Sequence, residues 1–179
     1  MMNTAARTDM SRPEERKLPG AYPNLKVFHA DADHVVATWH RTVIEVWRGV
    51  ATVAGSERMI ATCERMLAEV GTPVTFIAVL ERSSPPPAEP VRKALAHWSR
   101  DVVPRMASAV LVAEGGGFRA ALVRGVGTAL TLLMPHKVPF KFCTSIDEGL
   151  KTLAPSLVRS PGGVLGLSAA VDQARQLGM

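Results

Sequence analysis

The sequence is short of aromatic residues and has no uninterrupted apolar run long enough to cross a membrane. Aromatic residues make up 5% of the 179 positions and the basic residues are scattered, so the aromatic and basic array favoured by single-stranded nucleic acids is missing. We therefore expect no nucleic-acid partner. The longest apolar window, residues 118–134, is interrupted by Arg119 and Arg124. The first twenty residues lack the apolar segment of a secretory signal, so we expect a cytoplasmic protein.

Cysteine is scarce, and the usual catalytic motifs are missing. Cys63 and Cys143 lie far apart in apolar surroundings, and we expect two reduced thiols in the core. The sequence contains no G-x-S-x-G, H-E-x-x-H, C-x-x-C or P-loop pattern. The stretch HADADH would place His29 and His34 on opposite faces if it were extended. We therefore predict no catalytic residue, no cofactor and no metal site.

The sequence does contain apolar runs that alternate with amphipathic stretches. Hydrophobic residues make up 47% of the chain and charged residues 21%, which is typical of one globular domain with tails. Residues 35–40 and 43–47 are rich in β-branched and aromatic side chains and predict two antiparallel strands. Residues 59–70 carry apolar side chains at helical spacing, after Thr52 or Ser56 as the N-cap. Residues 74–80 are apolar throughout, as in a central strand covered on both faces.

The second half of the domain continues this alternation. A helix is expected from Pro90 to Pro104, followed by a strand at 109–113, a glycine turn and a helix at 117–133. Another strand at 138–143 precedes a helix opened by the capping box Ser145–Glu148. The order β-β-α-β-α-β-α-β-α predicts an α/β fold, with a mixed sheet of about five strands and helices packed against it.

Composition also divides the chain into a domain and two tails. Residues 1–21 mix charged residues with Pro and Gly and predict a disordered leader. The domain is expected to span residues 22–155. Residues 156–179 then form a linker and a short C-terminal helix. Three alternatives are open for that helix from the sequence: it packs on the domain, it packs on a partner, or it is frayed.

Two loops after neighbouring strands carry the candidate binding residues. Strand 74–80 leads into the loop ERSSPPPAEP, which predicts a rigid, exposed segment with two hydroxyl groups at the ligand end of the sheet. The glycine turn matches G-x-G-x-x-A, but no acidic residue ends the next strand, which favours a tight turn over a dinucleotide site. Free amides at the following helix start form the alternative, an anion site. The candidate binding residues are Ser83, Ser84, Gly115, Gly116, Gly117 and Arg119.

The element order, together with four stretches, resembles the STAS superfamily and in particular its SpoIIAA-like (STAS/SEC14-type) branch. The stretches are TVIEVWRG (42–49), VTFIAVLE (74–81), SAVLVAEGGGFRAAL (108–122) and VPFKFCTSIDEGLKTL (138–153). The resemblance covers roughly residues 33–155 and implies a regulatory or binding domain rather than a catalyst. In anti-sigma-factor antagonists of this superfamily, a serine after the central strand is phosphorylated. The comparable position here reads ERSSP and departs from the family's Asp-Ser-(Ser/Thr)-Gly sequence.

The resemblance implies a protein partner, and we therefore expect a non-catalytic regulatory or protein-interaction module. The first alternative is a carrier of a small apolar molecule or lipid, in a pocket near Ser83 and Gly116. The second alternative is an enzyme of unrecognised type. Gly125 and Gly127 lie inside the expected helix 117–133, where glycine costs about 1 kcal/mol relative to alanine. Close packing on the sheet or on a second copy, and hence a homodimer, would account for them.

Overall fold

The computed structural model describes residues 24–70, 73–115, 125 and 140–179, and its centre is one mixed β-sheet. Six strands follow one another across the sheet in chain order: β1 (Leu25–Ala30), β2 (His34–Trp39), β3 (Thr42–Trp47), β4 (Thr75–Leu80), β5 (Ser108–Ala113) and β6 (Phe140–Cys143). β1, β2 and β3 are antiparallel, and β3 to β6 are parallel. The predicted α/β fold with a mixed sheet is confirmed. It has six strands rather than about five because the stretch that begins at Leu25 pairs with β2.

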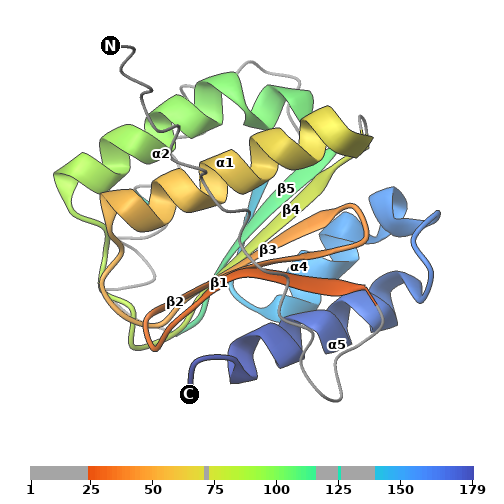
Figure 1. Cartoon of the computed structure of the whole chain (residues 1–179). Helices are drawn as coiled ribbons and strands as arrows, with labels where there is room; N and C mark the ends of the chain where they lie inside the picture. Colours follow the sequence, from red (N-terminus) through yellow and green to blue (C-terminus); the bar gives the residue numbers. More distant parts are fainter. Residues whose placement is uncertain (1–23, 71–72, 116–124, 126–139) are drawn as a thin grey trace, which may run out of the picture.

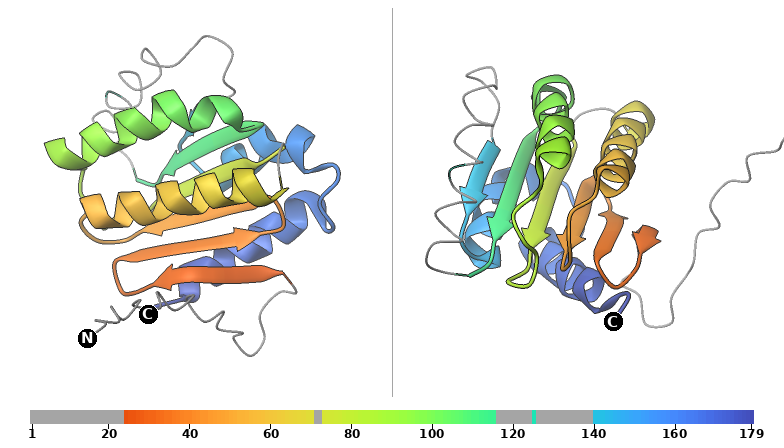
Figure 2. Two further views of the ribbon diagram at one scale, coloured as in Figure 1. Left: turned by 45° about the horizontal axis from the view of Figure 1, so that its top comes forward. Right: turned by 90° about the vertical axis from the view of Figure 1, so that its left-hand side faces the viewer.

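Helices cover both faces of this sheet (Figures 1 and 2). α1 (Val53–Val70) and α2 (Glu89–Asp101), followed by the 3-10 turn Val103–Arg105, pack on one face. α4 (Ile146–Leu153), the 3-10 turn Ala154–Leu157 and α5 (Gly163–Gln176) pack on the other. The strands β2, β3 and β4 are buried along their whole length. Two apolar cores therefore lie on either side of the central strands, as the continuous apolar run of β4 predicts.

Local sequence signals determine where the helices begin. The Thr52 hydroxyl accepts a hydrogen bond from Gly55 N at 3.0 Å, so Thr52 caps α1. The Ser145 hydroxyl accepts one from Glu148 N at 3.2 Å, while the Glu148 carboxylate accepts one from Thr144 N at 3.1 Å. The capping box is thus present, although its glutamate reaches one residue further back than Ser145. α2 carries a proline in its first turn, as predicted.

The C-terminal helix packs directly on the sheet. α5 buries Leu167, Ala170, Val171 and Ala174 completely and contacts β2 and β3. Gly166 lies against the indole of Trp39, because a Cβ atom there would be 2.6 Å from the ring. Of the alternatives for this segment, docking on the domain is the one observed. The predicted leader 1–21 lies outside the described residues, as does the predicted helix 117–133 apart from Gly125.

The strand β1 forms one border of the sheet and is irregular. Its register against β2 shifts between Val27 and His29, which marks a β-bulge. Lys26 is exposed on this strand. Among the described helices, none has the length and apolar character needed to cross a membrane.

We expect Gly166→Ala to lower the free energy of unfolding by about 1–2 kcal/mol. A methyl group would overlap the Trp39 ring, and Trp39 is only 1% exposed and has no room to shift. Overpacking of this kind costs about 1–3 kcal/mol, partly offset by the better helix propensity of alanine. Urea denaturation measures the change. Ser168→Ala, two positions along the same helix, is the matched control and should have little effect.

We expect both thiols to resist modification in the native protein. Cys63 and Cys143 are buried and free. Burial raises the pKa of both thiols, so little of either is present as the reactive thiolate. Ellman's reagent at pH 8 should label neither cysteine until denaturant is added, and then both. Fast labelling of either thiol without denaturant would contradict this packing.

Candidate functional site

The carboxyl ends of the parallel strands lie together at one end of the sheet, here called the carboxyl end. A charged residue follows each of three neighbouring strands: Arg48 after β3, Glu81 after β4 and Glu114 after β5. The amides of Glu81 and Glu114 continue the ladder, because they donate to Trp47 O and Leu80 O, both at 2.9 Å. Open α/β sheets bind their ligands at this end, so these three side chains are the first candidates for a site.

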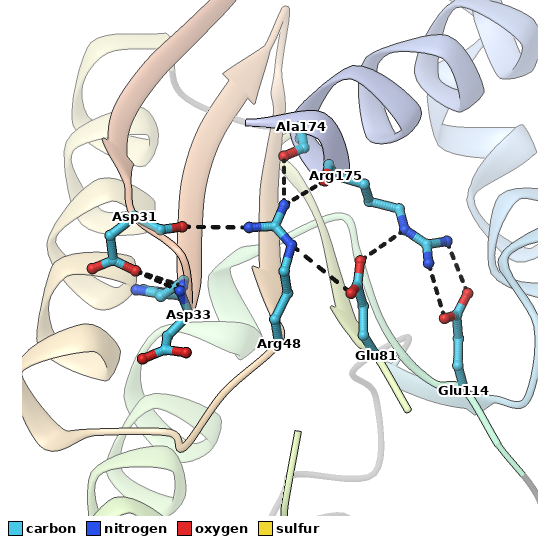
Figure 3. A network of polar contacts seen from close by, with 8 residues as sticks. Asp31, Asp33, Arg48, Glu81, Glu114, Ala174 and Arg175 are labelled. Carbon is cyan, nitrogen blue, oxygen red and sulfur yellow. Dashed lines mark hydrogen bonds and ion pairs between the residues drawn. The ribbon is translucent and has the colours of Figure 1, made fainter. Parts of the chain in front are cut away.

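Arg175, near the end of α5, joins two of these carboxylates (Figure 3). Its guanidinium donates to Glu114 through both terminal nitrogens, at 2.9 and 3.1 Å, and to Glu81 through Nε at 3.0 Å. Partial burial alone would lower the pKa of Arg175, but the carboxylates of Glu114 and Glu81 outweigh it and raise the pKa above its ordinary value. The guanidinium therefore stays charged and holds α5 to the ends of β4 and β5.

Arg48 completes the network from the other side. Its guanidinium is mostly buried and lies 3.8 Å from Glu81, measured from Nε to Oε2. It donates to the carbonyl oxygens of Ala174 and Arg175 in the last turn of α5, where the helix leaves carbonyl groups without a full set of intrahelical partners. A further hydrogen bond of 3.4 Å reaches Asp31 O in the turn between β1 and β2. Positive charge at a helix carboxyl end is favourable, so Arg48 both caps α5 and fixes its position.

The turn between β1 and β2 accepts hydrogen bonds from Arg48 through its backbone carbonyl groups. The Asp31 carboxylate accepts hydrogen bonds from Asp33 N at 2.9 Å and His34 N at 2.8 Å, which closes the turn. Asp33 O in turn accepts from Arg48 N at 2.8 Å. A Cβ atom at Gly49 would lie 2.1 Å from the Asp33 carboxylate, so a larger residue there would displace the Asp33 side chain.

A second polar group lies buried beneath α1. The Glu45 carboxylate accepts a hydrogen bond from Trp47 Nε1 at 2.9 Å and lies 3.2 Å from His34 Nε2. The rings of His34 and Trp47 stack at 3.6 Å, and a Cβ at Gly55 would overlap the indole. The His34 ring lies 5.4 Å from the His29 ring, because a turn and not an extended stretch joins the two residues, so the condition of the opposite-face expectation is not met. His34 and Trp47 therefore supply the buried Glu45 carboxylate with hydrogen-bond partners, as a buried charge requires.

The structure brings the two predicted loops to the same end of the sheet, because β4 and β5 are paired neighbours. Ser83 is exposed in the loop after β4, as predicted. Ser84 is only 1% exposed, so the prediction of two exposed hydroxyls is wrong for this residue. Its amide donates to Glu81 O at 3.0 Å, and this turn directs the side chain inward, where its hydroxyl has no hydrogen-bond partner among the described residues.

Only the first glycine of the predicted turn falls within the described residues. Gly115 has a φ of 111°, a conformation that favours glycine and agrees with a tight turn after β5. Gly116, Gly117 and Arg119 lie outside the described residues, so the anion site predicted at their amides remains a prediction.

The sequence interpretation missed the charged network at this end. The charges directly after the strands were the available signal, since Arg48, Glu81 and Glu114 each follow an apolar run. Arg175 carried no such signal, because its partners are 94 and 61 residues away in the chain. Its role depends on where α5 packs.

Comparison with protein-family models, with curated proteins and with solved structures finds no match to this chain. The resemblance to the STAS superfamily therefore remains a prediction from the sequence.

We expect Arg48→Gln to destabilise the protein more than Arg175→Gln. Removing Arg48 takes a charged donor away from the carbonyl oxygens of Asp31, Ala174 and Arg175, while Glu81 keeps its hydrogen bond to Arg175. Leaving buried acceptors unsatisfied in this way should cost about 2–3 kcal/mol. Arg175 is 29% exposed, and its loss should cost about 1–2 kcal/mol. Urea denaturation measures both, with exposed Arg58→Gln as the control. Equal effects of the three substitutions would contradict the network.

Proposed function

We propose that this protein is a non-catalytic regulatory module, similar to SpoIIAA-like STAS domains, that binds a protein partner at the carboxyl end of its sheet. The observation that carries the proposal is the pairing of Arg48, Glu81, Glu114 and Arg175 with one another. An enzyme or ligand site at this end would present its charged groups to a substrate. Here they are neutralised by the chain's own C-terminal helix, which leaves the surrounding loops to make external contacts.

These loops carry the features of a contact surface, which we call the rim: Val50, Val53, Ser83, Pro85 and Pro86. The valines precede and begin α1 and are 62% and 37% exposed. The serine and the prolines are exposed in the loop after β4, and β4 is the paired neighbour of β3. A run of prolines holds an extended conformation in advance, so a partner that binds it loses little conformational entropy.

The rim favours a protein partner over an apolar small molecule. Two cavities in the described part of the chain, one beside β1 and α1 and one at the amino end of the parallel strands, are not lined by Ser83 or Gly115. Both include charged side chains, Lys26 and Arg65 in one and Arg41 and Arg159 in the other. Neither of these two cavities has the apolar lining that a lipid carrier would need.

Site-specific photo-crosslinking in the native cell tests the proposal. We expect a photoreactive amino acid at position 83 to capture a defined protein, and one at exposed position 64, in the middle of α1, to capture none. In a binding assay with that purified protein, Val50→Asp should lower the affinity at least tenfold, because a charge would be buried in the contact. Glu64→Gln is the matched control.

The proposal fails if positions 83 and 64 capture the same proteins, or if Val50→Asp binds as tightly as the unaltered chain. Native mass spectrometry supplies a second readout. A lipid that remains bound to the purified protein, together with no specific crosslink from position 83, would favour the carrier function instead.

A further inference from the structure

The opposite end of the sheet, where the parallel strands begin, holds a small cavity of about 240 Å³. Three separate segments surround it: the turn between β2 and β3, the start of β4, and the loop that joins α4 to α5. Its lining consists of His40, Arg41, Pro73, Thr75, Ser156, Arg159, Ser160 and Pro161. The cavity is independent of the charged network and the rim, which lie at the other end of the sheet.

The charge of this cavity is unbalanced. Arg41 and Arg159 are exposed, and neither guanidinium has a hydrogen-bond or ion-pair partner among the described residues. None of the described lining residues is acidic. At the carboxyl end of the sheet, by contrast, Arg175 is fully paired with carboxylates. Two unpaired arginines that converge on one cavity attract an anion.

The remaining lining residues supply hydrogen-bonding groups. Ser156 and Ser160 bring hydroxyls from the loop before α5, while the Thr75 hydroxyl is paired with that of Thr42 at 2.7 Å. Ser160 lies two residues before Gly162, which is the N-cap of the 14-residue helix α5. The positive end of the helix dipole therefore adds to the field of the two arginines.

The backbone around the cavity is held in place. His40 has a φ of 50°, and its ring packs edge-on against the indole of Trp39 at 4.5 Å between centroids. The amide of Thr75 donates to Arg41 O at 2.9 Å, which ties the turn between β2 and β3 to the start of β4. The backbone of Arg41 is thus fixed beside the cavity, so binding does not have to order this part of the chain.

We propose that this cavity binds a phosphate group, either as free phosphate or as part of a small phosphorylated molecule. Arginine forks fit phosphate oxygens in bidentate geometry, and serine hydroxyls donate to the remaining oxygens. The volume of about 240 Å³ is below the range of about 300–1,000 Å³ usual for larger ligands, so one phosphate with a small organic body fits best.

Calorimetric titration of the whole chain tests this assignment, with inorganic phosphate and glycerol phosphate as separate probes at matched ionic strength. We expect saturable binding, and at least a tenfold weaker affinity in each of Arg41→Gln and Arg159→Gln. Both side chains are exposed, so the variants should fold normally, which circular dichroism checks. Exposed Arg105→Gln, in the turn after α2, removes the same charge elsewhere and should bind like the unaltered chain.

The two probes also identify the source of the phosphate. A tenfold tighter affinity for glycerol phosphate supports a phosphorylated small molecule, and equal affinities support free phosphate. The proposal is overturned if neither probe binds more than chloride does, or if Arg105→Gln weakens binding as much as the two cavity substitutions. Neither failure bears on the partner-binding proposal, because the rim lies at the other end of the sheet.

Discussion

The placement of the C-terminal helix α5 depends on the buried guanidinium of Arg48. From the end of β3 it reaches three other parts of the chain: the turn between β1 and β2, Glu81 after β4, and the carboxyl end of α5. An arginine has enough donors to reach all three at once, and a lysine does not have this planar geometry. Because α5 covers β2 and β3, the contact at its end also fixes the apolar layer beneath it.

The two ends of the sheet differ in charge balance, and this difference separates two proposed roles. At the carboxyl end, the arginines and glutamates neutralise one another, and the rim of valines, serine and prolines surrounds them. At the amino end, Arg41 and Arg159 line a cavity without an acidic neighbour among the described residues. α5 runs from one end to the other, with its positive pole toward the cavity and its negative pole capped by Arg48.

Local patterns were enough to predict most of the fold, but not the contacts between distant segments. The apolar run of β4, the Ser145 cap and the cap of α1 each depend on neighbouring residues and follow from the sequence. For α1, the structure selects Thr52 from the two predicted candidates, Thr52 and Ser56. The docking of α5 depends instead on a sheet face left uncovered by α1 and α2. The burial of Ser84 and the partners of Arg175 likewise depend on how distant segments pack. The sequence therefore predicted which loops lie at the candidate site, but not the charged side chains that pair there.

The bulge in β1 has a consequence for how copies of this protein behave toward one another. A border strand with regular hydrogen-bonding groups offers a template on which a second sheet can extend. The register shift between Val27 and His29 breaks that regularity, and Lys26 places a positive charge on the same strand. Two identical borders brought together would therefore mismatch in register, which disfavours aggregation through continuous sheets.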